Sequence, residues 1–364
     1  MNNDLERIKA WLTLLSAPEI GHATAIRLVK VVGEPIDFIN EPLELTEIDF
    51  ISELAKEHLT NNLEPENWQN VCDLIEQYSI KFVSILDDNY PEPLKNIFDP
   101  PPFLFYRGEI KKDDFRRALA VVGTRKASNY GKLMTKKIVQ ELARSGFTIV
   151  SGLAYGIDTI SHLAALDSGS RTYAVMGTGV DQIYPSRNRE LAERILGNGI
   201  LISEFIPGSK AEKWNFPTRN RIISGLALGS LIIEGNKKSG ALLTAKFAMD
   251  QNRDVFALPG DINRSQAEGP NYLIKLGAKI VTNASDILEE YELVMDSQNK
   301  PFPKLNEKEE IVYQILLNNK PEIHFDKLIV LTGFTVGEIS TILLSLELRN
   351  VVKKVPGNKI VPLY

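Results

Sequence analysis

From residue 118 to residue 281 the sequence alternates short apolar runs with stretches of helical periodicity, and this alternation restricts the fold more than any other feature. The apolar runs lie at residues 118–122, 148–150, 172–175, 199–203, 230–233, 255–257 and 279–281. Helical patterns at residues 134–145, 159–168 and 242–251 fill intervals between them, and each ends near a Gly, an Asn or another polar break. Strands that alternate with helices favour a parallel sheet with crossover helices. We therefore predict a doubly wound, mostly parallel α/β domain.

The segment before this domain has a different pattern. Residues 5–79 carry apolar side chains at three- and four-residue spacing, which predicts short amphipathic helices. Within it, residues 18–25 resemble a helix-hairpin-helix or SAM-like turn, in which Gly21 would let the chain reverse. Prolines crowd residues 87–102 and predict an extended connection, because proline removes a backbone donor and restricts the residue before it.

The segment after the α/β domain begins with a polar, proline-containing stretch that is typical of a linker. Helical patterns follow, and then two β-rich runs around Pro356-Gly357-Asn358, which together predict a winged helix. DNA binding and protein contact fit this segment equally well, because its first helix opens with acidic residues and its helices carry few cations. The predicted domains are helical and SAM-like at 1–80, α/β at 81–295, a linker at 296–306 and a winged helix at 307–364.

The charge of the chain is unevenly distributed. The whole chain has a formal net charge of −5, but residues 1–80 contain 5 Lys/Arg and 15 Asp/Glu, whereas residues 115–285 contain 23 Lys/Arg and 13 Asp/Glu. The middle of the chain is therefore basic, as a nucleic-acid-binding domain would be, although scattered solvated side chains would give the same counts.

Composition also bears on location and on metal binding. Cys72 is the only cysteine, so the chain can form neither an intrachain disulfide nor a cysteine-rich zinc site. No apolar stretch reaches the length of a membrane span, and the N-terminus lacks the pattern of a signal peptide. We therefore expect a cytoplasmic protein with no membrane association. The four histidines are far apart in sequence, and we predict no metal and no cofactor.

Three successive apolar runs end in glycine-rich turns. They continue as Gly123-Thr-Arg125-Lys126, as Ser151-Gly152-Leu-Ala-Tyr-Gly156 and as Gly177-Thr-Gly179. In a Rossmann-like sheet such turns lie at the carboxyl ends of the strands, where ligands bind, and backbone N–H groups at a strand-to-helix turn favour anions. None of the turns has the full Gly-x-Gly-x-x-Gly fingerprint, which disfavours an NAD enzyme. The first of these turns, taken alone, fits a tight turn with solvated basic residues equally well.

Two further segments carry the densest chemistry. In the first, Phe216 precedes Arg219, Asn220 and Arg221, an arrangement in which the arginines would hold phosphates while the aromatic ring stacks on an unpaired base. In the second, cations and small polar residues surround a predicted helix start and suit phosphate contact; they include Lys237, Ser239, Gly240 and Thr244. A core position for Phe216 and a solvated turn at Lys237 are the alternatives.

These segments together resemble the DNA-processing protein A (DprA/Smf) family over essentially the whole chain. The strings that carry the resemblance begin at Val121-Val-Gly-Thr-Arg, Ser151-Gly-Leu-Ala-Tyr-Gly-Ile-Asp, Phe216-Pro-Thr-Arg-Asn-Arg, Ser239-Gly-Ala-Leu-Leu-Thr and Leu258-Pro-Gly. The resemblance implies a SAM-like N-terminal domain, a Rossmann core that binds single-stranded DNA and forms a homodimer, and a C-terminal winged helix. It also implies protection of incoming single strands and loading of the RecA recombinase during natural transformation.

The resemblance assigns the DNA pocket residue by residue. It implies contacts from Gly123, Arg125, Phe216, Asn220, Arg221, Lys237, Ser239 and Gly240, with the turn between Gly152 and Gly156 beside them. Arg125 and Arg221 would hold phosphates. The chain departs from the family pattern at Thr218, where many relatives have arginine, and at Ala241, where they have serine. Both departures remove a polar or cationic contact and bear on affinity.

Enzymatic alternatives have weaker support in the sequence. Related Rossmann-like cores include phosphoribohydrolases with a Pro-Gly-Gly-x-Gly-Thr signature, which this chain lacks. We expect His162 to pair with Asp158 four residues earlier, and Glu204 and Glu234 to hold backbone donors or arginines. We therefore predict a DNA-binding protein and not an enzyme; a nucleotide-processing enzyme and a scaffold that only dimerises and recruits RecA are the alternatives.

Overall fold

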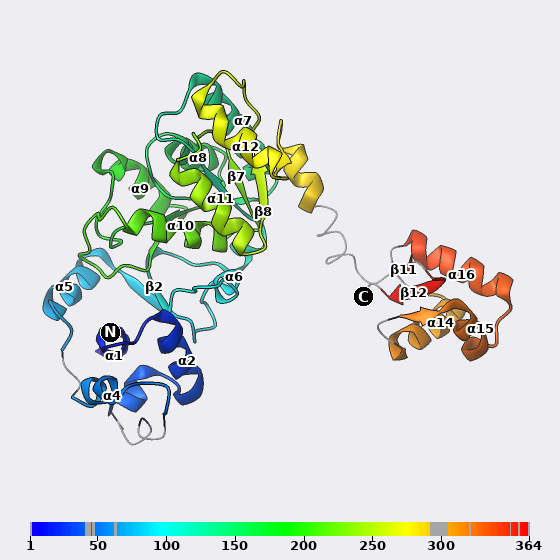
Figure 1. Ribbon diagram of the computed structural model, residues 1–364, viewed down its shortest axis with the longest axis horizontal. Helices are drawn as coiled ribbons and strands as arrows, with labels where there is room; N and C mark the ends of the chain where they lie inside the picture. Colours follow the sequence, from blue (N-terminus) through cyan, green and yellow to red (C-terminus); the bar gives the residue numbers. More distant parts are fainter. Residues whose placement is uncertain are drawn as a thin grey trace. The chain divides into compact units, whose positions relative to one another are not determined.

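The computed structural model describes residues 2–40, 45, 48–61, 64–291, 305–319, 322–349, 351–355 and 357–362. The chain divides into two compact units, Met1–Ile287 and Leu288–Tyr364, and each is described by itself (Figure 1). Most of the predicted linker at 296–306 lies outside the described residues.

A nine-stranded sheet forms the centre of the first unit, in the order β1-β2-β6-β5-β4-β3-β7-β8-β9. Seven neighbouring strands, from β6 to β9 in that order, run parallel, whereas β2 pairs antiparallel with β6 and β1 antiparallel with β2. The strands are β1 (Lys81–Ser84), β2 (Phe103–Gly108), β3 (Ala118–Val122), β4 (Thr148–Ser151), β5 (Thr172–Val175), β6 (Gly199–Ser203), β7 (Gly229–Ile232), β8 (Asp254–Ala257) and β9 (Lys279–Ile280).

The helices of the core form two groups. One group is α7 (Asn129–Arg144), α8 (Ile157–Asp167) and α9 (Arg189–Leu196), and the other is α10 (Asn215–Gly225), α11 (Gly240–Asp250) and α12 (Glu268–Lys275). The first group packs on β3 to β6, whereas α11 and α12 pack on β7 and β8. Because crossovers are right-handed, the reversal of strand order on either side of β3 puts the two groups on opposite faces. The predicted Rossmann-like, doubly wound, mostly parallel sheet is confirmed.

Several elements differ from the sequence prediction. Helix α7 starts at Asn129, five residues earlier than predicted, because the side chain of Ser128 caps it by accepting from the Gly131 N–H at 3.1 Å. Strands β1 and β2, on either side of the proline-rich connection, were not predicted. Their side chains are almost all buried or half-buried, so they extend the sheet as a covered antiparallel edge.

Five helices precede the sheet in the first unit: α1 (Asn2–Ser16), α2 (His22–Val32), α3 (Pro35–Asn40), α4 (Glu53–Thr60) and α5 (Trp68–Tyr78). They share a hydrophobic core with the sheet, in which Trp11 packs edge to face on Phe103 with ring centroids 6.0 Å apart. Between α1 and α2 the left-handed residue is Glu19, at φ 65°, and Gly21 has φ −91°. The predicted role of Gly21 in the reversal is therefore wrong.

The second unit is a winged helix, as predicted. It contains α14 (Glu307–Asn318), β10 (Ile323–His324), α15 (Phe325–Thr332), α16 (Val336–Leu348), β11 (Val352–Val355) and β12 (Lys359–Pro362). The three strands form a small sheet in the order β10-β12-β11. Capping boxes at Asn306 and Thr335 fix the starts of α14 and α16.

Candidate functional site

The sheet topology brings the predicted glycine-rich and basic segments to one edge. Strands β3 to β7 are parallel neighbours, so the turns that follow them all lie at their carboxyl ends. Strand order reverses between β3 and β7, which separates the turn beginning at Gly123 from the turn that ends at Ser239. Ligands of open α/β sheets bind in the crevice at such a reversal.

A cavity of about 560 Å³ occupies this crevice. Its wall contains Gly123 and Arg125 after β3, Phe216, Arg219 and Asn220 from α10, and Ser239, Gly240 and Thr244 at the start of α11. A small neighbouring cavity of about 30 Å³ shares Arg125, Phe216 and Arg219 and adds Gly152. The structure therefore brings together nine of the thirteen residues that the sequence suggested for the site.

An aromatic pair and two cations form the accessible part of the cavity. The rings of Phe216 and Tyr184 lie 5.3 Å apart at an angle of 42°, and the Arg125 guanidinium carbon lies 5.8 Å from the Phe216 ring centroid. Arg125 and Lys213 are exposed, whereas Phe216 is half-buried because it packs against the backbone at Gly177. This arrangement can hold a planar ring against the aromatic pair and an anion against the cations.

Arg219 forms a buried cationic floor. Its Nη1 donates to the carbonyl of Gly152 at 2.8 Å and also to the carbonyl of Val175, and burial lowers the pKa of Arg219 to about 10. Asp158 accepts from the N–H groups of Gly152 at 3.2 Å and Ala154 at 3.4 Å. Burial raises the pKa of Asp158, and the positive charge of Arg219 offsets only part of this rise. Because Arg219 is bonded to carbonyls and forms no ion pair within 4.0 Å among the described residues, it contributes positive potential to the cavity.

The start of α11 supplies backbone polarity to the same cavity. Ser239 is the N-cap residue, and a Cβ at Gly240 would meet no atom within 4 Å, so the backbone there is open to a ligand. Asn220 lies beside it and donates from Nδ2 to the Gly240 carbonyl at 3.3 Å. The positive end of this helix therefore adds to the field of Arg125, Lys213 and Arg219.

Gly156 has a structural role next to the cavity. It adopts φ 79°, and a Cβ there would lie 2.3 Å from the Thr124 carbonyl oxygen. Only glycine fits this position, because the turn after β4 passes directly against the turn after β3. Gly156 thus positions the Arg125 turn, although it is not part of the cavity wall.

Arg221 lies away from the cavity, which corrects the expectation that it holds a phosphate. Its guanidinium donates to both oxygens of Glu204, at 2.7 and 2.6 Å, and to Asp99 at 3.0 Å, and its side chain is only 5% exposed. Burial alone would lower the pKa of Arg221, but the charges and hydrogen bonds of Glu204 and Asp99 outweigh it and raise the pKa. Each of its three guanidinium nitrogens already donates to a carboxylate, so a phosphate would have to displace these bonds.

Two other predicted cations also lie outside the cavity wall. Lys126 is exposed on the turn after β3, and Lys237 is exposed on the turn after β7 with its ammonium 5.6 Å from the Tyr272 ring centroid. Both remain on the same edge of the sheet, where they add charge around the cavity.

The sequence predicted contacts for His162, Glu204 and Glu234. The first prediction is wrong, and the other two are confirmed. His162 does not pair with Asp158, because its Nδ1 lies 2.7 Å from the Thr172 hydroxyl; burial lowers the pKa of His162 to about 3. Glu204 holds Arg221, as expected. Glu234 accepts from the backbone N–H and the hydroxyl of Ser128 at 2.9 and 2.5 Å, and so ties the start of α7 to the end of β7.

Sequence reasoning missed Tyr184 and Lys213. Tyr184 is in the segment after the third glycine-rich turn, and Lys213 lies three residues before Phe216, just outside the basic segment that was singled out. The signal that could have identified them was an aromatic or basic side chain close to a segment already assigned to the site.

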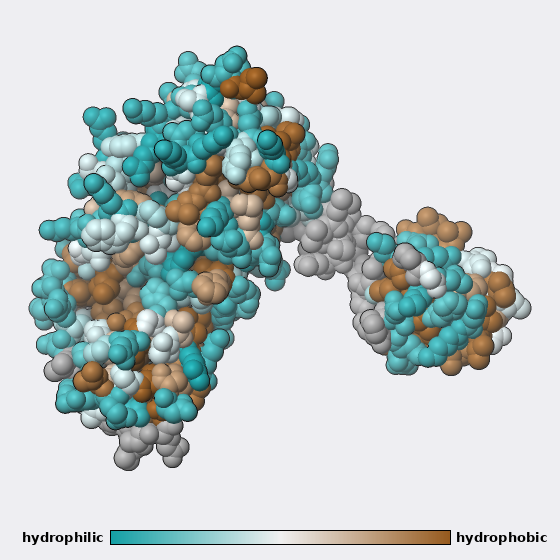
Figure 2. All heavy atoms as spheres, viewed as in Figure 1, coloured by the Kyte–Doolittle hydropathy of each residue, from teal (hydrophilic) through white to brown (hydrophobic). Residues whose placement is uncertain are grey.

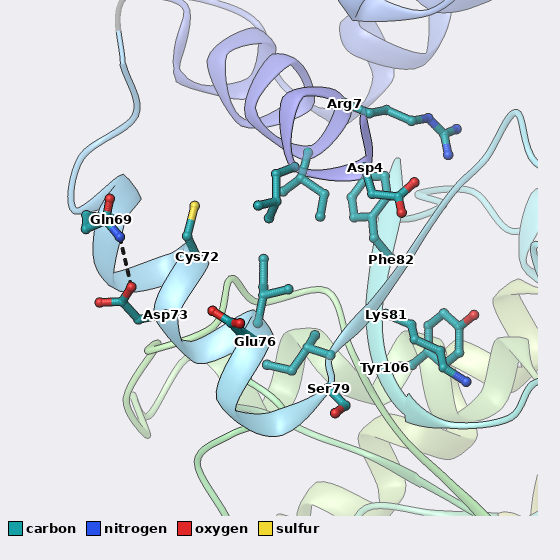
Figure 3. Close-up of a pocket in the computed structure, with 14 residues that line it drawn as sticks. Asp4, Arg7, Gln69, Cys72, Asp73, Glu76, Ser79, Lys81, Phe82 and Tyr106 are labelled. Atoms are coloured by element: carbon teal, nitrogen blue, oxygen red, sulfur yellow. Dashed lines mark hydrogen bonds between the residues drawn. The ribbon is translucent and has the colours of Figure 1, made fainter. Parts of the chain in front are cut away.

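A larger cavity, of about 740 Å³, lies elsewhere in the first unit (Figure 3). It is enclosed by α1, α5 and the first two strands, with carboxylates of Asp4, Asp73 and Glu76 around apolar side chains. The Asp73 carboxylate accepts from the Gln69 amide at 2.8 Å. The predicted site residues are absent from its wall, whose cations are Lys81 and Arg7, and Arg7 already donates to Glu34 and Asp87.

Positive charge in the winged helix lies on its hairpin, with Lys353 and Lys354 on β11 and Lys359 on β12. Helix α16 contains Glu338 and Glu347 but no Lys or Arg. Exposed apolar residues lie on α15 and α16 instead, including Val330, Leu344 and Leu348, and apolar surface is visible on this unit in Figure 2. No single described helix is long and apolar enough to cross a membrane; α15 and α16 meet that test only as a pair bent by 112°.

Two family models match the chain. The model for DNA recombination-mediator protein A matches residues 81–292, and the model for the DprA winged helix domain matches residues 300–358.

Curated relatives agree with these matches. Protein Smf of Synechocystis is 36% identical over 333 residues, covering 82% of this chain and 83% of the relative. Protein Smf of Escherichia coli is 38% identical over 292 residues, covering 78% of each. DNA processing protein DprA of Streptococcus pneumoniae is 46% identical over 209 residues, covering 57% of this chain and 73% of the relative.

Two solved structures share the fold. The structure of DprA from Streptococcus pneumoniae superposes with a TM-score of 0.64 at 34% identity, over 78% of this chain and 95% of that one. A structure of DprA from Helicobacter pylori, described as showing a single-stranded DNA binding mode, has a TM-score of 0.53 at 28% identity, over 60% of this chain and 97% of that one.

Proposed function

The chain belongs to the DNA recombination-mediator protein A family, also called DprA or Smf, and from this premise we propose that it binds single-stranded DNA in the cavity between β3 and β7. The family membership makes DNA the expected ligand class. The Helicobacter pylori relative is described as binding single-stranded DNA, which supports the same ligand here.

The observation that carries the proposal is the combination of an aromatic pair with cations at the strand-order reversal. The rings of Phe216 and Tyr184 would stack on bases, while Arg125 and Lys213 would neutralise phosphates. The buried charge of Arg219 and the start of α11 would add to the attraction without direct contact. This assignment replaces Arg221 with Lys213 and keeps Arg125 as the main phosphate contact.

Unpaired DNA fits this cavity better than a duplex does. Phe216 is half-buried within a wall formed by three turns, so only a base that has left its stack can place its face on the ring. The contacts are to rings and phosphates, which every nucleotide has, so sequence preference should be slight. Affinity should fall steeply with salt because phosphate neutralisation releases counterions.

We further propose the cellular role that the family resemblance implied. The protein would act in the cytoplasm, protect incoming single strands and load the RecA recombinase on them during natural transformation. It would act as a homodimer. Exposed apolar side chains support a protein contact at one side of the sheet: Tyr272 on α12, Leu276 directly after it and Ile280 on the edge strand β9.

The hydrogen bonds of the carboxylate in the cavity wall favour DNA binding over nucleotide processing. Asp158 is the carboxylate among the residues of its wall, and it is bonded to two backbone N–H groups beside Arg219. Carboxylates and imidazoles are common general acids and bases, and the carboxylate of the described wall is held by these bonds; Tyr184 and Lys213, its other titratable side chains apart from arginines, are the proposed DNA contacts.

Fluorescence anisotropy with labelled poly-dT and a matched duplex, across a salt series, tests the proposal. The wild type should bind poly-dT much more tightly than duplex, and Arg125→Ala and Phe216→Ala should each weaken poly-dT binding. Arg116→Ala is a matched control, since Arg116 is exposed and paired only with Asp113, three residues earlier in the chain. The proposal fails if poly-dT does not bind, or if both cavity variants bind it as the wild type does; nucleotide hydrolysis assays would then follow.

A further inference from the structure

We propose that single-stranded DNA leaves the cavity across a row of three exposed aromatic residues, Tyr155, Tyr184 and Trp214, and that Trp214 is a second base-stacking site outside the cavity. We call these three residues the aromatic row. The inference deepens the proposed function and rests on it, because it assumes that the strand enters the cavity.

The row follows the order of the strands. Tyr155 lies in the turn after β4, Tyr184 in the segment after β5, and Trp214 at the end of the segment after β6. Strands β4, β5 and β6 are parallel neighbours, so the three segments lie side by side along the carboxyl edge of the sheet. The ring contact of Tyr184 with Phe216, at 5.3 Å between centroids, joins the segment after β5 to the start of α10, two residues from Trp214.

The row begins at the cavity. Tyr184 belongs to the wall of the main cavity and to that of the small one beside it, and Tyr155 belongs to the small one. Trp214 belongs to neither, but it lies next to Lys213 and two residues before Phe216, which both do. Residues two apart in a helical turn point to different sides, so Trp214 lies outside the cavity, and a strand that leaves Phe216 past Lys213 would reach it at the start of α10.

Trp214 is unusual among the tryptophans of the chain. Its exposed fraction is 69%, whereas Trp11 is 0% and Trp68 is 9% exposed. Its carbonyl accepts from the Thr218 hydroxyl at 2.9 Å, whereas its indole forms no hydrogen bond, ring contact or cation–π contact with a residue that the structure describes. The exposed indole face is therefore a favourable platform for a base.

Cations accompany the row as phosphate contacts require. Arg187 lies three residues after Tyr184, and Lys210 and Lys213 precede Trp214. All three side chains are exposed, and none forms an ion pair with a residue that the structure describes. Glu212 is the one acidic side chain within this stretch of residues 205–214.

Intrinsic fluorescence tests the inference directly, because Trp214 is the tryptophan that DNA can reach. Titration of the full chain with oligothymidylate of about 16 nucleotides should quench the emission. Trp214→Phe should abolish the quenching but keep most of the affinity, since it retains an aromatic ring. Trp214→Ala should weaken binding by roughly tenfold, with an unchanged unfolding midpoint. Phe216→Ala and Arg125→Ala are measured in parallel.

The possible outcomes separate this inference from the function on which it rests. If Phe216→Ala loses binding while Trp214→Ala binds as the wild type does and the emission stays constant, the cavity is correct and the aromatic row is wrong. If the wild type itself fails to bind oligothymidylate, both proposals fall.

Discussion

Replacement of Arg221 should destabilise the fold and leave the DNA contacts intact, although the sequence places this residue in the densest basic segment. In Arg221→Met the Glu204 carboxylate, which is only 7% exposed, loses both of its bonds to the guanidinium. Removal of one partner of a buried ion pair costs about 3–5 kcal/mol, because the remaining charge stays buried without compensation. For a unit of this size that cost corresponds to a fall in Tm of about 10 °C.

The assay is thermal and urea unfolding followed by tryptophan fluorescence. All three tryptophans, Trp11, Trp68 and Trp214, belong to the first unit, so the signal reports that unit alone. Arg125→Met is the matched control, because Arg125 is exposed and should change the free energy of unfolding by less than about 0.5 kcal/mol.

A double variant separates loss of charge from loss of packing. Arg221→Met with Glu204→Leu removes both buried charges and should recover much of the stability that the single variant loses, as Asp99 is half-exposed and remains hydrated. A structural role for Arg221 would be refuted if Arg221→Met unfolded at the wild-type midpoint and yet lost its affinity for poly-dT. That result would mean that Arg221 faces the strand in solution.

Three further results are expected. His162 is neutral and buried, and its pKa is about 3 in the folded chain against 6.5 when exposed. Its contribution to the free energy of unfolding is therefore complete above pH 6.5 and is lost as the pH falls toward 3. Between pH 7 and pH 5 the free energy of unfolding should fall by about 2 kcal/mol more in the wild type than in His162→Gln. Lys126→Ala and Lys237→Ala should each reduce the slope of log K against log salt by about 1, uniformly across sequences, in anisotropy titrations; an unchanged slope would remove them from the DNA path. Gly156→Ala should lower both the unfolding midpoint and poly-dT affinity, because its Cβ would overlap the Thr124 carbonyl, and wild-type values for both would show that the turn can move.

The sheet was predictable because the parallel strands β3 to β7 are short, fully buried runs between helical patterns, whereas β8 and β9 at the edge are partly exposed. Strand β3, for example, is buried at every position and has the predicted bounds. The antiparallel strands β1 and β2 were missed because they flank the proline-rich segment, whose composition masks a strand on either side. Their pairing with each other and with β6 joins residues that are far apart in sequence.

The location of the site was predictable from the sequence, whereas the roles of individual residues were less so. Glycine-rich turns and basic residues after successive strands must meet at one edge, which placed Gly123, Arg125 and Phe216 correctly in one cavity wall. The role of Arg221 was not assigned, because the sequence did not show which arginine Glu204 holds, and the second partner, Asp99, lies 122 residues away. A buried arginine and a phosphate-binding arginine look alike in sequence until the carboxylates around them are known.

The most direct test of the central claim is to identify the residues that a bound base touches. Photocrosslinking of an oligothymidylate that carries iododeoxyuridine, followed by mass mapping of the peptides, reports aromatic side chains in contact with the base. We expect adducts on the peptides that contain Tyr184 and Phe216, and we expect these adducts to disappear when excess unlabelled poly-dT competes. Adducts confined to the α1–α5 cavity or to the winged helix would contradict it.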